Sequence, residues 1–157
     1  MKISAAIAIV LLVLPGFTSW FVPDSQAASW GTPKDAERVV KGAVSRIKKV
    51  GKEKAFVAFN DPNGSFSYRD LYVAVYDFSG KCLAHGADRS RIGTVFIDDK
   101  DVDGKLFVRE RLAKAKADGK GWQDYKFMNP VTKKVEAKTS YFEVVDDVIV
   151  VCGAYKP

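Results

Sequence analysis

Histidine and cysteine are scarce in this sequence of 157 residues, which contains one histidine, His85, and two cysteines, Cys82 and Cys152. A Ser-His-Asp triad or a Cys-His pair needs a histidine beside the reactive group. His85 has no cluster of cysteines, histidines or carboxylates near it in the chain, and both cysteines lie in apolar, strand-like runs. The composition therefore does not favour an enzyme, and we expect no cofactor and no metal held by His85.

Charge of one sign is not concentrated anywhere either. The 25 Lys and Arg residues alternate with 19 Asp and Glu residues along most of the chain, although the net charge is +6. A positive balance favours anionic partners such as small carboxylates or lipid headgroups. Because the basic residues form no block, we expect a mixed, solvated surface and no nucleic-acid partner.

A long hydrophobic run occurs at the N-terminus. Lys2 precedes the apolar stretch from Ile3 to Leu14, and Pro15-Gly16 interrupts it. The small residues Ser25 and Ala27 then suit cleavage after residue 27, so residues 1–27 are predicted to be a signal peptide and the location periplasmic or secreted. The alternative is an uncleaved anchor, because Ile3 to Val22 is almost long enough to span a bilayer. Only in that case do we expect membrane contact.

The remaining chain predicts a linker at residues 28–33 and one domain at residues 34–157. Thr32-Pro33 is typical of a helix start, and apolar residues then recur at helical spacing up to Gly51. From Leu71 the period changes to two. The pattern predicts helices at 33–51, 54–59 and after Asp103-Gly104, and strands at 71–77, 81–85, 122–128, 135–145 and 148–154. This order is typical of an α+β fold, a five-stranded antiparallel sheet with helices packed to one side.

A series of short motifs follows this order along residues 34–157. They are Asp70-Leu71-Tyr72-Val73, Asp77-Phe78-Ser79-Gly80, Lys100-Asp101-Val102-Asp103-Gly104, Gly121-Trp122-Gln123-Asp124-Tyr125, Asn129-Pro130, Lys138-Thr139-Ser140-Tyr141 and Gly153-Ala154-Tyr155. With this spacing the chain resembles the single Cache domains, the PAS-like extracytoplasmic sensor modules of bacteria. The resemblance implies an N-terminal helix on one side of the sheet and a pocket on the sheet for a small organic anion, often a short carboxylic acid. Because no signalling domain follows, we expect any sensing role to need a separate membrane signalling protein.

Six side chains are the candidate ligand contacts. The family places a lysine at the position of Lys138 and often a histidine at that of His85, while tyrosine hydroxyls and a tryptophan wall suit a half-buried pocket. The predicted ligand-binding residues are Tyr72, Tyr76, His85, Trp122, Tyr125 and Lys138. The alternatives are a solvent-facing Lys138 and aromatic residues that belong to the core. The competing function is a basic extracytoplasmic interaction or adhesion protein that binds a protein or an anionic surface.

The resemblance also bears on the cysteines. In PAS-like sheets the first strand lies between the second and the fifth, which would carry Cys82 and Cys152. Strands two apart are separated by about 9–10 Å, whereas a disulfide needs Cα atoms within about 7 Å. Two unpaired, buried thiols are therefore predicted.

One acidic loop matches the pattern of a calcium-binding loop. Asp99, Asp101, Asp103, Gly104 and Glu110 have the ligand spacing of an EF-hand. Against this, the preceding segment is predicted to be extended, and Lys100 and Lys105 reduce the local negative charge. The alternative is a loop in which Asp103 caps the next helix, and the calcium site stays a weak candidate.

Overall fold

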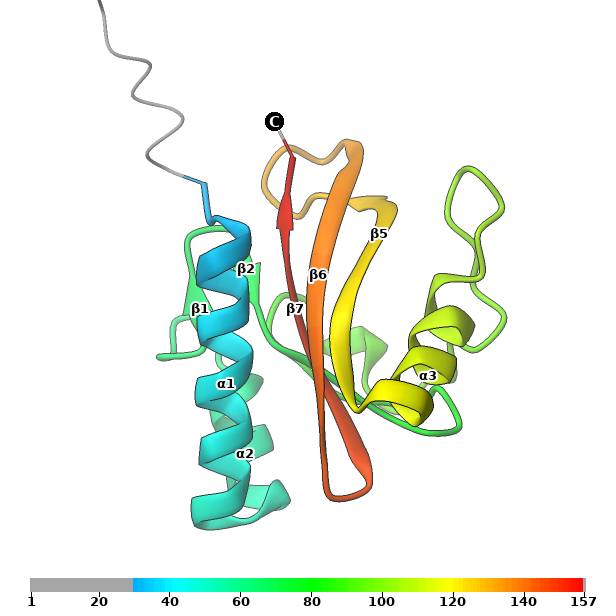
Figure 1. The fold of residues 1–157 in the computed structure, drawn as a ribbon. Coiled ribbons are helices and arrows are strands. Elements are labelled where there is room, and N and C mark those ends of the chain that lie inside the picture. Colours follow the sequence, from blue (N-terminus) through cyan, green and yellow to red (C-terminus); the bar gives the residue numbers. More distant parts are fainter. Residues whose placement is uncertain (1–29, 157) are drawn as a thin grey trace, which may run out of the picture.

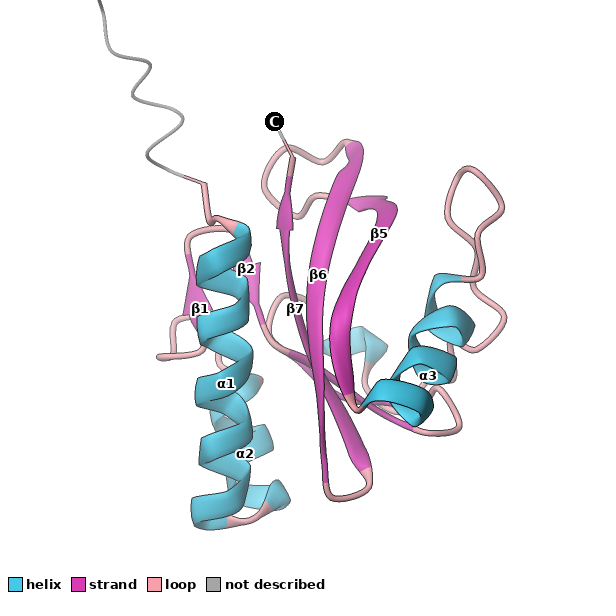
Figure 2. Ribbon diagram, viewed as in Figure 1, coloured by secondary structure: helices cyan, strands magenta, loops and turns pink. Residues whose placement is uncertain are grey.

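The structure, a computed structural model, describes residues 30–156, so the predicted signal peptide lies outside the described residues. The helices and strands follow one another as an α+β chain (Figures 1 and 2). In chain order they are α1 (Pro33–Val50), α2 (Lys52–Phe59), β1 (Ser67–Tyr68), β2 (Leu71–Tyr72), β3 (Ala74–Asp77), β4 (Cys82–His85), the 3-10 helix η2 (Arg89–Arg91), α3 (Phe107–Asp118), β5 (Lys120–Met128), β6 (Val135–Val145) and β7 (Val148–Tyr155).

Helix α1 begins as the sequence predicts. The Thr32 side chain accepts a hydrogen bond from the backbone N–H of Asp35, and the Asp35 carboxylate accepts one from the backbone N–H of Thr32. This capping box satisfies donors that the first helical turn leaves free, and Pro33 at the next position needs none. The helix then buries one stripe, which includes Val40, Val44 and Ile47.

The main sheet has five antiparallel strands in the order β4-β3-β7-β6-β5. The predicted turn between β6 and β7 is confirmed: Val145 pairs with Val148, so Asp146 and Asp147 form a two-residue connection. Asp146 has a φ of 52°, a conformation that aspartate tolerates better than most residues. The sheet thus brings the first strand of the predicted pattern next to the last.

The two faces of this sheet carry separate clusters. One face packs on α1 and α2, and its apolar residues from β3 and β7 include Val75 and Val150. The other face packs on α3, with Ile149 and Val151 among its buried residues. Figure 1 shows α1 and α3 on opposite sides of the sheet. The expectation that all helices lie on one side is therefore wrong for α3, because the loop from β4 crosses to the second face before that helix begins.

Both cysteines are buried and free, as predicted. Strand β3 lies between their strands, β4 and β7. Cys82 belongs to the cluster under α3, whereas Cys152 belongs to the cluster under α1. Burial raises the pKa of Cys82 to about 11 and that of Cys152 to about 12, so both remain protonated thiols at neutral pH.

Candidate functional site

The polar end of the α3 face holds a small inner cavity between the sheet and α3. Its free volume is about 20 Å³, which is room for about one water-sized group. Five of the six predicted contact residues line it: Tyr72, Tyr76, His85, Tyr125 and Lys138. Buried polar side chains are concentrated here, whereas the rest of this face is apolar.

Lys138 extends from β6 into the inner cavity and is 3% exposed. Its ammonium group donates to the hydroxyls of Tyr72 at 2.9 Å and Tyr155 at 3.3 Å. Among the described residues it has no carboxylate partner within 4 Å. Burial lowers the pKa of Lys138, but the phenol oxygens around it have the larger combined effect, and the pKa is raised above its usual value. The site therefore holds a buried positive charge that no carboxylate of residues 30–156 neutralises.

Gly153 on β7 leaves room for the Lys138 side chain. A Cβ atom at this position would lie 2.0 Å from the Ser140 hydroxyl oxygen and 2.7 Å from Cε of Lys138. Both contacts are far shorter than van der Waals distance. Only glycine at 153 thus allows the Lys138 stem and Ser140 to share this face of the sheet.

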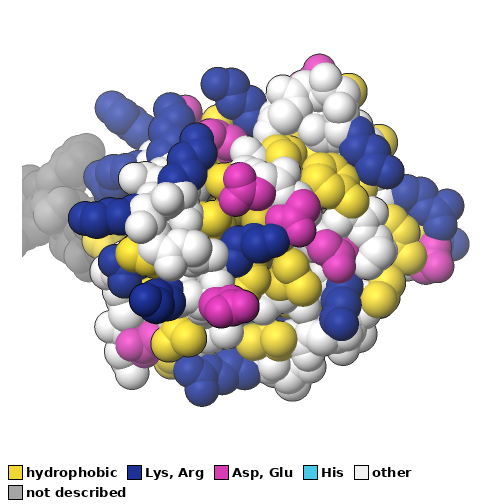
Figure 3. Space-filling view, turned by 90° about the horizontal axis from the view of Figure 1, so that it is seen from below, with side chains coloured by type: hydrophobic (Ala, Val, Ile, Leu, Met, Phe, Trp, Pro, Cys, Tyr) yellow, Lys and Arg dark blue, Asp and Glu magenta, His cyan; other side chains and the backbone are white. Residues whose placement is uncertain are grey.

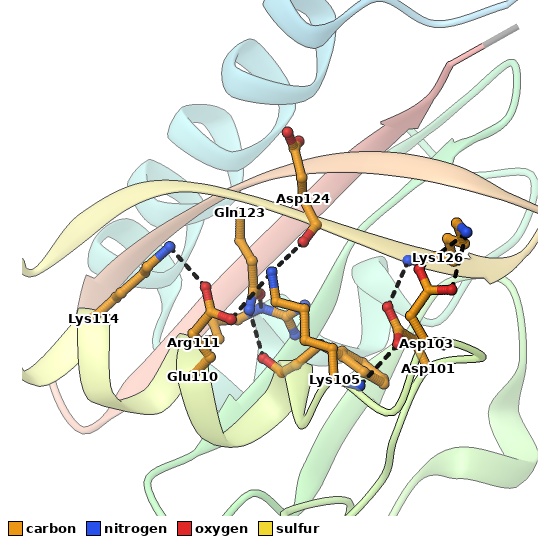
Figure 4. Close-up of polar contacts among 10 residues, drawn as sticks. Asp101, Asp103, Lys105, Glu110, Arg111, Lys114, Gln123, Asp124 and Lys126 are labelled. Atoms are coloured by element: carbon orange, nitrogen blue, oxygen red, sulfur yellow. Dashed lines mark hydrogen bonds and ion pairs between the residues drawn. The ribbon is translucent and has the colours of Figure 1, made fainter.

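Arg111 supplies a second buried cation, which was not predicted from the sequence. It projects from α3, is 2% exposed, and lines the same cavity. Its Nε donates to the Gln123 side chain at 3.2 Å, and Gln123 in turn donates to the Phe107 carbonyl at 2.8 Å (Figure 4). The Nη2 atom is buried and has no hydrogen-bond partner among the described residues. A buried guanidinium nitrogen without an acceptor is costly, and it marks a place where an anion would bind favourably.

A signal for Arg111 was present in the sequence. The residue lies at helical spacing from the apolar residues Val108, Leu112 and Ala115, all of which are buried. An arginine in the apolar stripe of a helix faces the interior.

His85 lies at the end of β4 and is 3% exposed. Burial, together with the positive charges of Arg91 and Lys138, lowers the pKa of His85 to about 3. The ring is therefore neutral at pH 7. Its Nδ1 accepts a hydrogen bond from the backbone N–H of Asp88 at 2.9 Å, so we assign the ring proton to Nε2. His85 offers a neutral N–H donor in the wall of the cavity.

The predicted aromatic residues separate into two groups. Tyr76 and Tyr125 line the inner cavity, and Tyr125 accepts a hydrogen bond from Ser140 at 3.1 Å. Burial raises the pKa of Tyr125, but the charges of Lys138 and Arg111 outweigh it, and the pKa is lowered below its usual value. Trp122, by contrast, packs on Tyr141 in the cluster under α1 and is 40% exposed. The structure does not bring Trp122 to the cavity, because it alternates with the inward-facing Gln123 and Tyr125 along β5.

An outer cavity of about 340 Å³ adjoins the inner one. Tyr72, His85 and Phe127 line both, so the two are compartments of one site. The outer compartment also has the basic side chains of Arg91 and Lys133 in its wall. Its size is at the lower end of the range for small-molecule pockets.

The whole domain matches one protein family. The family model described as Single Cache domain 2 covers residues 25–156. The chain belongs to this family. No curated protein matches the sequence.

Three solved structures similar to this single Cache domain are chemotaxis or chemosensory proteins. A methyl-accepting chemotaxis protein from Vibrio parahaemolyticus has a TM-score of 0.66 and 21% identity over 78% of this chain and 86% of that one. A Cache chemosensory domain, solved to explain its carboxylic acid recognition, has a TM-score of 0.67 and 20% identity, covering 85% of this chain and 96% of that one. A periplasmic sensor domain of a chemotaxis protein has a TM-score of 0.63 and 20% identity, covering 88% and 100%. These likenesses establish the fold.

The acidic loop of this Cache domain does not gather its carboxylates. Asp101 accepts hydrogen bonds from the backbone N–H groups of Asp103, Lys105 and Lys126. Asp103 pairs with Lys126, and Glu110 pairs with Lys105 and Lys114 (Figure 4). Asp99 is instead oriented toward Arg91, at 3.8 Å. Within residues 30–156 no group of three or more His, Cys, Asp or Glu side chains is arranged to hold a metal ion.

The Cache domain itself contains no helix that could cross a bilayer. In the part of the chain that the structure describes, none of the helices is both long and apolar enough.

Proposed function

We propose that this chain is an extracytoplasmic binding domain that takes a small organic anion, with its carboxylate at Lys138 and Arg111. One observation carries the proposal. Two buried cations line one cavity, and neither has a carboxylate partner among the described residues. Removing a charge from water costs several kcal/mol unless it is paired, so a site built in this way is completed by an anion from outside.

The surrounding donors fit a carboxylate. The Tyr72 hydroxyl accepts from Lys138 at 2.9 Å, which leaves its own proton for a ligand oxygen. The neutral His85 ring contributes its Nε2–H. Charge-assisted hydrogen bonds of this kind are about twice as strong as neutral ones, and Phe107 and Phe127 provide apolar walls that limit water. Carboxylic acid recognition by one of the similar Cache chemosensory domains agrees with this ligand class.

The role is sensing rather than catalysis, as is typical of Cache domains. Another of the similar structures is the periplasmic sensor domain of a chemotaxis protein, which supports a periplasmic or secreted location. On the face that Figure 3 shows, Lys and Arg side chains are interspersed with Asp and Glu, so this face gives the competing adhesion role no support.

The test is calorimetry and thermal-shift screening of short organic acids against the wild type and two variants. Lys138→Met removes the buried cation, whereas Lys41→Met removes a surface lysine that pairs with Glu37 on α1. We expect saturable binding to the wild type and to Lys41→Met, and none to Lys138→Met. Equal binding to both variants, or no acid bound by the wild type, would contradict the proposal.

A further inference from the structure

The positive charge around the two compartments exceeds what one carboxylate neutralises. Four cations line them: Lys138 and Arg111 in the inner compartment, and Arg91 and Lys133 in the outer one. Two carboxylates lie near them. Asp88 lines the outer compartment, and Asp99 is 3.8 Å from Arg91. Two positive charges are left without a counterpart among the described residues.

Two arginine nitrogens without a hydrogen-bond partner among the described residues belong to residues that line different compartments. Within residues 30–156, Nη2 of Arg111 and Nε of Arg91 are both buried without a hydrogen-bond partner. Arg91 is held in place by packing, because its guanidinium lies 3.9 Å from the Phe96 ring centroid and 5.4 Å from that of Phe127. A planar, pre-oriented guanidinium is the side chain best suited to bind a carboxylate. One carboxylate at Arg111 would leave the nitrogen of Arg91 without an acceptor.

The volumes of the two compartments indicate a ligand that extends through both. The inner compartment, at about 20 Å³, accommodates one water-sized group, such as one carboxylate oxygen, while the outer compartment offers about 340 Å³. A ligand anchored at Lys138 therefore extends past Tyr72 and Phe127 into the outer compartment. Its far end then lies among Arg91 and Lys133.

We propose that the ligand is a small dicarboxylate, with one carboxylate at Lys138 and Arg111 and the other at Arg91 and Lys133. This inference rests on the proposed function and specifies its ligand. A monocarboxylate of the same length would place an apolar end against Arg91 and leave part of the surplus positive charge of the two compartments unneutralised, so the second carboxylate provides the discrimination.

The experiment compares each monocarboxylate with the dicarboxylate of equal chain length. The pairs are propionate and malonate, butyrate and succinate, and valerate and glutarate. Isothermal titration calorimetry at pH 7 gives each dissociation constant. We expect the best dicarboxylate to bind about tenfold or more tightly than its matched monocarboxylate, as an additional charge-assisted pair implies.

Arg91→Gln locates the second carboxylate, and Arg89→Gln is its control. Both arginines belong to η2, but Arg89 donates to the Asn60 carbonyl and does not line either compartment. Arg91→Gln is expected to remove the preference for the dicarboxylate, so that succinate binds the variant no more tightly than butyrate does. Arg89→Gln should retain the preference.

The outcomes separate the two proposals. If monocarboxylates bind as tightly as dicarboxylates, or if Arg91→Gln keeps the preference, the dicarboxylate assignment is overturned and the anion site stands. If neither series binds to the wild type, the proposed function fails with it.

Discussion

The two faces of the sheet are built from the same strands but in opposite ways. On the α1 face, alternate residues of β7 are Val148, Val150, Cys152 and Ala154, and they pack against an apolar stripe of α1. On the α3 face, the neighbouring residues run from Ile149 and Val151 to Gly153 and Tyr155, where the buried polar groups are concentrated. One face therefore supplies packing energy, and the other uses part of its area for groups that are costly to bury.

This difference separates stability from binding within one small domain. Burial of apolar area stabilises the fold by about 25 cal/mol per Å², and the α1 face provides it mainly with apolar side chains. The α3 face contains Lys138, Arg111, Gln123 and His85, all less than 4% exposed. A site with uncompensated charge persists only because the rest of the structure holds it.

The largest expected effect is on the α1 face. Phe59, at the end of α2, is fully buried and packs edge-on against Phe66, with ring centroids 4.7 Å apart. Phe59→Ala should lower the free energy of unfolding by about 3–5 kcal/mol, measured by urea denaturation. At a temperature where the variant is still folded, its ligand affinity should match that of the wild type. A large loss of affinity there would show that the two faces are not independent.

The second expected effect is a pH dependence that originates on the α3 face. The unfolded state binds a proton at His85 below about pH 6.5, whereas the folded state keeps the ring neutral because its pKa is lowered to about 3. Between these values the unfolded state holds more protons, so stability falls as the pH falls. At pH 5 the ligand-free protein should have lost about 2 kcal/mol relative to pH 7.

Replacing the histidine isolates this effect. Most carboxylates titrate below this window, so the slope between pH 7 and pH 5 belongs mainly to the histidine. His85→Gln should flatten the slope in urea denaturation at several pH values. An unchanged slope in the variant would assign the pH dependence to other groups.

The third prediction concerns the charge at the centre of the site. Lys138→Met replaces a buried ammonium with an apolar side chain of similar length, and the ligand-free variant should be about 1–2 kcal/mol more stable than the wild type. The gain is limited because the Tyr72 hydroxyl loses its donor. Differential scanning calorimetry measures it. A variant less stable than the wild type would mean that Lys138 supports the fold rather than the site.

The same contrast explains what the sequence could predict. Apolar periodicity and turn residues predicted the five strands of the main sheet and the helices, although the predicted strand 71–77 is divided into β2 and β3, and only β3 belongs to the main sheet. The resemblance to single Cache domains placed the first strand between the second and the fifth, as the structure has it. The same resemblance also suggested Lys138 and His85 as ligand contacts, and both line the inner cavity. Period two places residues of one strand on one of two faces, but it does not say which face a given helix covers. The side of the sheet that α3 occupies depends on a loop crossing and was predicted wrongly.

The missed residues have a common physical cause. Arg111 and Arg91 come from α3 and η2, whose positions against the sheet depend on long-range packing. Helical spacing indicates that Arg111 faces the interior, but not which residues it meets there. Charged residues are mostly exposed, so a prediction from composition assigns such arginines to the surface. Only the three-dimensional arrangement places Arg111 and Lys138 around one cavity.

The smallest expected effect tests the assignment of faces directly. Trp122 and Tyr125 lie three residues apart on β5, and both were predicted to contact the ligand. Tyr125 lines the inner cavity, whereas Trp122 packs on Tyr141 under α1, at a centroid distance of 5.1 Å.

Trp122→Ala should cost about 0.5–1 kcal/mol of stability and leave ligand affinity unchanged. Tyr125→Phe, which removes one hydroxyl from the cavity, should weaken the ligand about three- to tenfold because a polar partner is lost. Calorimetric titration of both variants with the same acid provides the comparison. If Trp122→Ala weakens binding as much as Tyr125→Phe does, the ligand contacts the α1 face as well, and the division of the sheet into a packing face and a binding face is wrong.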